Sequence, residues 1–224
     1  MPLSFGRKNK TWLSRAAALL GDLDSNLPVA AGNRAVLNSK APARLVDLRS
    51  PEIFRSGFIP GSYNVPDVAC WITAQRGGLF NDREIYFLAD DPDQLILCEE
   101  FGTIGAGSEL AGWFGPDALE EWRSSAKTSG TIQIFHLEEL AKLLSNDEIV
   151  VLDIVDSGKS ILQPTPLDTM ALQFGVDELP LCLDGLPAET PLCIRAANPA
   201  LASFAASLIW NFGLHRVGYL QGSI

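Results

Sequence analysis

Residues 43–66 read ARLVDLRSPEIFRSGFIPGSYNVP, and this stretch decides the fold that the sequence predicts. Arg44–Leu48 is apolar and bounded by turn residues, which is typical of a short buried strand. Pro60 and Gly61 form a turn signal that leads into a second predicted strand, Tyr63–Pro66. A short helix fits between the two strands, so the predicted unit is strand, helix, tight loop and strand.

The helix signals in this stretch are local and specific. Ser50 stands where an N-cap residue is expected, because its side chain can accept a hydrogen bond from the first free backbone N–H groups. Pro51 follows at the first helical position and Glu52 lies in the first turn, where the helix dipole favours an anion. Gly57 is placed to end the helix after little more than one turn.

This pattern resembles the first signature of the rhodanese (sulfurtransferase) family: an apolar strand, D-x-R, a Glu, then G-H-I-P-G-A. The chain matches the signature at Asp47, Arg49, Glu52, Gly57, Ile59, Pro60 and Gly61. Phe58 replaces the usual His, and Ser62 replaces the usual Ala. The resemblance implies a structural role for the matched residues, with Arg49 pairing with acids near the loops.

The pattern restarts in the second half of the chain. Glu148–Ile154, which contains Asp153, repeats the apolar strand that carries Asp47, and a strand at Pro191–Arg195 precedes a helix at Ala200–Phe212. The tail then resembles the end of a rhodanese domain, G-F-x-x-V-x-x-L-x-G-G, at Gly213, Val217, Leu220 and Gly222. Alternating strands and helices predict the α/β class, with parallel sheets covered by helices on both faces.

The resemblance implies two tandem rhodanese-like domains. We expect a basic N-terminal arm and helix over residues 1–27, a first domain over 28–125 and a degenerate second domain over 131–224, joined by a linker at Ala126–Gly130. The stretch Leu88–Gly112 is also similar to the rhodanese region of metallo-β-lactamase/rhodanese fusion proteins. The chain lacks the His-rich metal motif of the hydrolase part of those proteins.

Composition narrows the possible partners. The formal net charge is −10, although the first twenty residues carry four basic side chains and no acid. An acidic body disfavours nucleic acid and anionic membrane surfaces. No run of 18 apolar residues predicts a membrane span, and no signal-peptide pattern is evident, so we expect a cytoplasmic protein.

The four cysteines are Cys70, Cys98, Cys182 and Cys193, and none forms a C-x-x-C pair. This spacing predicts neither a disulfide framework nor a zinc site. With two histidines in the chain, a His-based metal centre is not expected either. We therefore expect no metal and no cofactor.

The resemblance also implies where a nucleophile should stand. An active rhodanese places a Cys at the end of a strand, and the loop C-x-x-G-x-R wraps its backbone N–H groups around the thiolate or persulfide. In the first domain this position falls at Ala89, followed by Asp90 and Asp91. Carboxylates in this loop would repel an anionic sulfur donor and raise the pKa of a thiol.

In the second domain the nucleophile position falls at Ala196, between Arg195 and the loop residue Asn198. Pro199 stands where Gly is usual, and Leu201 where Arg is usual. Any ligand that the two loops still bind would contact Asp90, Asp91, Arg195 and Asn198, and we expect binding of small anions to be weak or absent.

The sequence therefore favours a pseudoenzyme of the sulfurtransferase family: a non-catalytic binding or regulatory module with an unidentified protein partner. One alternative is a thiosulfate sulfurtransferase that uses an unconventional cysteine, Cys98 or Cys193. The burial expected of both cysteines argues against that role. Another alternative is a structural subunit that docks on a sulfur-handling enzyme or a hydrolase.

Overall fold

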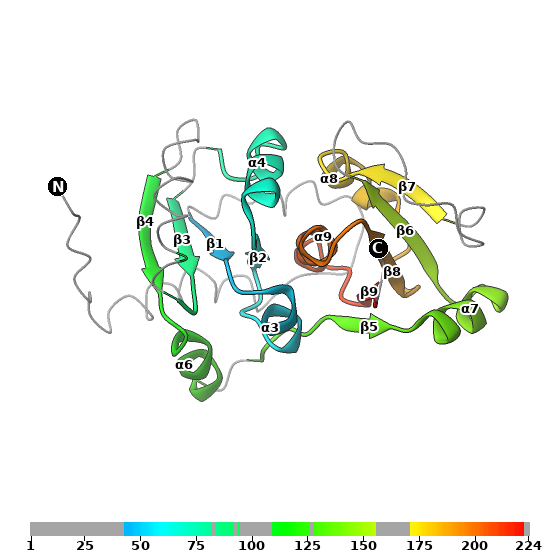
Figure 1. The fold of residues 1–224 in the computed structure, drawn as a ribbon, viewed down its shortest axis with the longest axis horizontal. Helices are drawn as coiled ribbons and strands as arrows, with labels where there is room; N and C mark the ends of the chain where they lie inside the picture. The colour runs from blue at the N-terminus through cyan, green and yellow to red at the C-terminus, as the bar shows by residue number, and fades with distance from the viewer. Residues whose placement is uncertain are drawn as a thin grey trace.

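A computed structural model of the chain describes residues 43–81, 84–91, 94, 109–125, 128–155 and 171–221. The expected N-terminal arm and helix, residues 1–27, lie outside the described residues. The described chain forms two sheets in which every strand pairs in parallel, with helices on either side (Figure 1). This confirms the predicted α/β class. In the part of the chain that the structure describes, no helix has the length and apolar character needed to cross a membrane.

The first sheet has the strand order β2-β1-β3-β4. Its strands are β1 (Ala43–Asp47), β2 (Ser62–Asn64), β3 (Glu84–Leu88) and β4 (Glu109–Phe114). The helices of this half are α3 (Pro51–Ser56), α4 (Val68–Arg76) and α6 (Ala118–Ser124). The predicted strand at Tyr63–Pro66 is thus displaced, because the chain leaves the sheet after Asn64.

The second sheet has the strand order β5-β9-β8-β6-β7. Its strands are β5 (Gln133–Phe135), β6 (Val150–Val155), β7 (Ala171–Gly175), β8 (Leu192–Ala196) and β9 (Val217–Leu220). Its helices are α7 (Leu137–Ser145), α8 (Leu179–Cys182), the 3-10 turn η1 (Leu183–Gly185) and α9 (Pro199–Asn211). The sequence patterns did not predict β5, β7 or α8, which are short.

The two sheets repeat one topology. Read from one edge, the order β2-β1-β3-β4 of the first sheet recurs as β7-β6-β8-β9 in the second, with β5 added beyond β9. Asp47 is in register with Leu88, and Asp153 is in register with Arg195. Ala89 and Ala196 therefore occupy equivalent places, each one residue after the residue that pairs with an aspartate.

The helix signals of the opening stretch act as expected. The Ser50 side chain accepts a hydrogen bond from the Ile53 backbone N–H at 3.4 Å, and Pro51 is the first residue of α3. The backbone N–H of Gly57 donates to the Phe54 carbonyl at 3.0 Å and ends the helix. These contacts set the direction in which the chain leaves β1.

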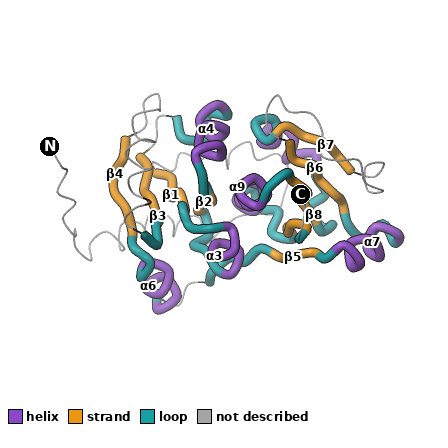
Figure 2. Tube along the Cα trace, viewed as in Figure 1, coloured by secondary structure: helices purple, strands orange, loops and turns teal. Residues whose placement is uncertain are grey.

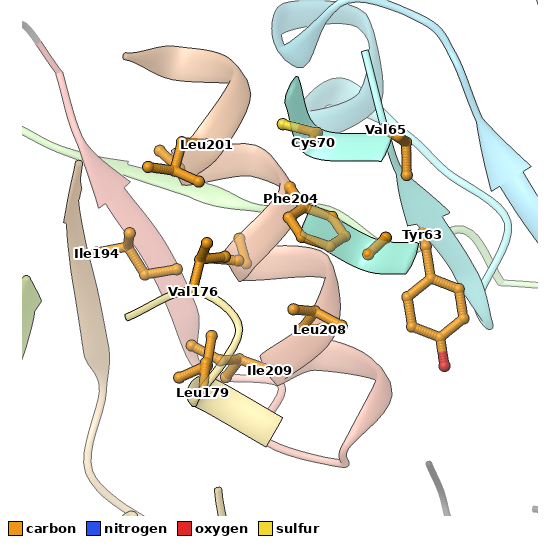
Figure 3. Close-up of a cluster of buried hydrophobic side chains, with 14 of the residues drawn as sticks. Tyr63, Val65, Cys70, Val176, Leu179, Ile194, Leu201, Phe204, Leu208 and Ile209 are labelled. Carbon is orange, nitrogen blue, oxygen red and sulfur yellow. The ribbon is translucent and has the colours of Figure 1, made fainter. Parts of the chain in front are cut away.

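Helix α9 lies between the two sheets and belongs to the core of both (Figure 1, Figure 2). Most of its side chains are buried, as expected for a helix that is apolar on nearly every face. Figure 3 shows Phe204 on the side of α9 that faces Tyr63, with Ile194 and Val176 on the other side. One continuous hydrophobic cluster joins residues of both sheets through this helix.

A polar seam runs along the contact between α9 and the edge strand β2. We call it the α9–β2 seam: Ser203, Ser207 and Asn211 on α9, with Ser62 and Asn64 on β2. Ser203 Oγ donates to Asn64 Oδ1 at 2.6 Å, and the Asn64 backbone N–H donates to Ser207 Oγ at 3.1 Å. Asn211 Nδ2 donates to the Ser62 carbonyl at 2.7 Å. Side chains of a helix thus replace a neighbouring strand along β2.

The predicted linker region is also held against the first half. Phe58 and Gly130 form an isolated antiparallel bridge, with N–H to carbonyl distances of 3.0 and 2.9 Å. A Cβ atom at Gly130 would lie 2.3 Å from the Phe58 ring, so only glycine fits this approach. The Phe58 ring also meets Trp210 of α9 edge to face, at 5.1 Å between centroids.

Candidate functional site

The candidate site lies at the carboxyl ends of the parallel strands, where open α/β sheets bind ligands. Ala89 and Ala196 stand there at the ends of β3 and β8, with 1% and 0% of their surface exposed. Neither described loop segment, residues 89–91 nor 196–198, contains a thiol. The structure therefore places buried methyl groups at both positions where the resemblance implies a nucleophile.

In the first loop, backbone donors are directed to acceptors within the protein. The Ala89 N–H donates to the Phe114 carbonyl at 3.1 Å, and the Asp90 N–H donates to Gln94 Oε1 at 3.1 Å. An anion-binding nest needs such N–H groups free and convergent. These two donors are already engaged, and the Asp91 side chain adds negative charge nearby.

Asp47 and Arg49 form a buried ion pair below this loop. Arg49 Nε donates to Asp47 Oδ1 at 2.9 Å and Arg49 Nη2 donates to Asp47 Oδ2 at 2.6 Å, a two-point contact. Burial raises the pKa of Asp47, and the hydrogen bonds and charge of Arg49 oppose that rise. The negative charge of Asp90 also raises the pKa of Asp47, so Asp90 acts on this pair electrostatically.

The contacts of Arg49 fit the structural role that the resemblance implies. Its Nη2 group also donates to the Gly57 carbonyl at 3.1 Å, which fixes the end of α3. The acid that pairs with Arg49 is Asp47 of the same motif. Glu52 lies in the first turn of α3, and Gly61, which follows Pro60 in the loop before β2, has a φ of 90° that favours glycine.

Asp153 and Arg195 form the matching pair in the second sheet. Arg195 Nε donates to Asp153 Oδ1 at 2.6 Å, and Arg195 Nη2 donates to Asp153 Oδ2. Both side chains are buried. Since Ile154 and Val155 follow Asp153 where Leu48 and Arg49 follow Asp47, the arginine comes instead from the adjacent strand β8. Its charge is thereby balanced by Asp153 inside the sheet.

The loop after β8 leads directly into the first turn of helix α9. Asn198 Oδ1 accepts a hydrogen bond from the Leu201 N–H at 2.8 Å, and Pro199 is the first residue of α9. Leu201 is buried in the core cluster that both sheets share. Asn198 therefore already serves as an N-cap, and its role as a ligand contact stays a prediction.

The described cysteines do not supply a replacement nucleophile at the strand ends. Cys193 lies within β8 and is fully buried, and burial raises the pKa of its thiol to about 12. A thiol with that pKa is protonated at neutral pH, whereas the thiolate is the reactive form. Cys70 is buried and Cys182 partly buried, and both are free thiols. Cys98 lies outside the described residues.

The sequence analysis did not predict the polar contacts of Asn64, which join the Asp47–Arg49 motif and β2 to helix α9. Asn64 Nδ2 donates to the carbonyls of Asp47 and Arg49 at 3.0 and 2.9 Å, while its other atoms bond α9. The available signal was the spacing of Ser203, Ser207 and Asn211, each four residues from the next in an otherwise apolar helix.

Within the described residues, no cluster of His, Cys, Asp and Glu could hold a metal ion.

Comparison with known proteins gives matches among solved structures. No protein-family model matches the chain, and no curated protein matches it. The thiosulfate sulfurtransferase from Pseudomonas aeruginosa matches with a TM-score of 0.34 and 14% identity, over 94% of this chain and 45% of that one. The 3-mercaptopyruvate sulfotransferase SseA from Escherichia coli, described as a "rhodanese" fold, matches with a TM-score of 0.29 and 11% identity, over 85% and 95%.

EanB in complex with ergothioneine matches with a TM-score of 0.34 and 15% identity, over 84% of this chain and 57% of that one. The chain thus spans about half the length of the first solved structures that it matches. Two of these structures carry the names thiosulfate sulfurtransferase and "rhodanese" fold, the family that the sequence motif resembles. With TM-scores below 0.5, the similarity carries no argument about activity.

Proposed function

We propose that this chain is a rhodanese-like protein that does not transfer sulfur and acts as a binding or regulatory module. The observation that carries the proposal is the pair of buried alanines, Ala89 and Ala196, at the ends of equivalent strands. Sulfur transfer by this fold needs a nucleophile that forms a persulfide, and a methyl group forms none.

The surroundings of both alanines support the same proposal. Asp90 and Asp91 place negative charge where an anionic sulfur donor would approach. In the second loop, Arg195 is the nearest cation in sequence, and its guanidinium is paired with Asp153. Restoring one sulfur atom would therefore not restore a site for thiosulfate.

The proposal includes two rhodanese-like units in tandem that act as one body, since α9 contributes to the core of both sheets. It also includes a cytoplasmic setting, which fits the free thiols Cys70, Cys182 and Cys193. A protein partner is the expected means by which a module without catalysis exerts an effect.

The test is a thiosulfate:cyanide assay combined with mass spectrometry of the intact protein. We expect no thiocyanate above the blank and no mass increase of one sulfur atom on any cysteine. The alternative, a sulfurtransferase with an unconventional cysteine, predicts turnover that disappears on Cys98→Ser or Cys193→Ser. Such a result would overturn the proposal.

Ala196→Cys is the matched comparison. It restores sulfur at the strand end but leaves Pro199, which has no N–H to donate, and leaves Arg195 paired. We expect this variant to remain inactive. Rapid turnover by Ala196→Cys would show that the loop still holds an anion, and that the loss of activity is confined to one residue.

A further inference from the structure

A pocket of about 190 Å³ lies where α4, the start of α8 and the side of α9 meet. In Figure 1, α4 and α8 stand on either side of α9. Helix α4 contributes Ala74 and the turn after it Leu79, while α8 contributes Leu181 and α9 contributes Phe204 and Leu208. The pocket is thus formed jointly by the two halves of the molecule, and none of its lining residues belongs to the loops after β3 and β8.

The walls of the pocket are apolar and its size suits one small group. Phe204 and Leu208 are almost fully buried, so this wall is fixed by the core. Leu181 is 74% exposed, and it stands at the pocket as a large apolar side chain open to solvent. An apolar cavity of ~150 Å³ can hold a benzene ring, so this pocket accepts an apolar body of about that size.

The charged side chain that lines the pocket is an acid, and the basic residue Arg76, in the last turn of α4, directly precedes the lining residue Gly77. Among the described residues that line the pocket, Asp177 alone is ionisable. The C-terminal end of α4 reaches the pocket at Gly77, and the carboxyl end of a helix favours positive charge. The chain carries a net charge of −10, which attracts cations at long range.

We propose that this pocket binds a small organic cation: a primary amine on an apolar body about the size of a single ring. The apolar body occupies the space between Leu79, Leu181 and Phe204, and the ammonium group lies toward Asp177. This inference deepens the proposed function, because it gives a binding module a site and a class of ligand.

The experiment measures binding of three probes of equal shape by isothermal titration calorimetry. Benzylamine carries the cation, benzyl alcohol is neutral and benzoate is an anion. We expect benzylamine to bind with the highest affinity and benzoate not to bind. Asp177→Asn should reduce the affinity for benzylamine about three- to tenfold and leave benzyl alcohol unchanged.

Three further variants locate the binding. Leu181→Ala removes an exposed wall and should weaken all binding, whereas Leu172→Ala, at an exposed leucine of β7 outside the pocket, is the matched control and should change nothing. Gly77→Leu should block the pocket. Gly77 has a φ of −73° and room for a Cβ atom, so the fold should tolerate this change.

Absence of benzylamine binding at millimolar concentration would overturn the inference and leave the absence of sulfur transfer untouched. Equal binding of benzoate, or binding that Gly77→Leu leaves intact, would overturn it as well. Thiocyanate production would instead refute the proposed lack of catalysis without bearing on the pocket. A peptide that binds through the same residues while benzylamine does not would assign the pocket to a protein partner and contradict the small-ligand inference.

Discussion

In each sheet an arginine neutralises a buried aspartate, and the two arginines come from different places in the sequence. In the first sheet, Asp47 at the end of β1 pairs with Arg49, two residues later. In the second sheet, Asp153 has no arginine after it and pairs with Arg195 across the strands. A buried carboxylate without a partner is strongly unfavourable, so each of the two aspartates needs an arginine nearby.

Arg195→Ala tests this substitution of partners. It leaves the Asp153 carboxylate buried without a counterion, and we expect the free energy of unfolding to fall by about 3–5 kcal/mol in urea denaturation. Arg123→Ala is the control, because Arg123 and Glu120 form an exposed pair that should contribute less than ~1 kcal/mol. Equal effects of the two changes would contradict a specific role for the buried pair.

Ionisation of the Tyr219 hydroxyl should lower the stability of the folded state at alkaline pH. Burial raises the pKa of its hydroxyl to about 12, from an ordinary value of 10.0. Between those values the folded state holds the proton more tightly than the unfolded state, so stability falls as pH rises through this window. The slope from one such group is at most about 1.4 kcal/mol per pH unit.

Tyr219→Phe should make that decline shallower between pH 10 and 12, as measured by urea denaturation at a series of pH values. At pH 7 the variant loses only a weak hydrogen bond, 3.5 Å from the hydroxyl to the Pro51 carbonyl, and should resemble the unaltered protein. An unchanged alkaline slope would show that the hydroxyl ionises as freely in the folded state as in the unfolded one.

At the scale of elements, α9 performs two tasks. It follows β8 as the covering helix of its own sheet, and it closes the open edge of β2 in the other. An unpaired edge strand exposes a row of backbone donors and acceptors that can pair with other chains. The Gly61 N–H and the Ser62 carbonyl find their partners on the Asn211 side chain, at 3.2 and 2.7 Å.

Asn211→Ala removes both of these contacts and leaves buried backbone groups unpaired. We expect a loss of about 2–4 kcal/mol in the free energy of unfolding, since each unsatisfied group is worth ~1–3 kcal/mol. Asn146→Ala, an exposed asparagine at the end of α7, provides the same chemical change without such contacts and should be close to neutral. A similar loss in both variants would argue against edge closure by α9.

The sequence predicted best those elements whose ends are set by contacts between residues close together in the chain. Ser50, Pro51 and Gly57 bound α3 through contacts with residues at most three positions away, so the sequence contains the whole signal. The strands β1, β3, β6 and β8 are apolar runs buried on both faces. β5 has three residues, and the side chains of β7 are exposed or half-buried, so neither is a continuous buried apolar run.

The sequence predicted where the candidate site lies in the fold. It predicted fewer of the contacts that the site residues make. The resemblance to the rhodanese family implied the positions Ala89 and Ala196, and the structure places both at the carboxyl ends of parallel strands. The partner of Arg195 could not be inferred in the same way, since the cross-strand register that joins it to Asp153 appears only in the assembled sheet. The pocket at Asp177 is formed by residues on and next to α4, α8 and α9, which are far apart in the sequence. No local sequence pattern therefore indicates it.

At the scale of the whole molecule, a single core spans both sheets. The hydrophobic cluster that contains Val46 and Phe87 of the first sheet also contains Leu152 and Ile194 of the second. The bridge between Phe58 and Gly130 adds backbone hydrogen bonds between the first half and the segment that leads to β5. The sequence suggests two domains, while the packing makes each half depend on the other.

Closure of β2 by α9 also sets the order of events at the ribosome. Ser62 and its partner Asn211 are 149 residues apart, so at about 5–20 residues per second the β2 edge stays unpaired for ~7–30 s after it is made. Every newly synthesised copy passes through this interval with a nearly complete first sheet and one open side. The backbone groups along this edge of the nascent chain therefore have no partner on α9 until that helix has been made.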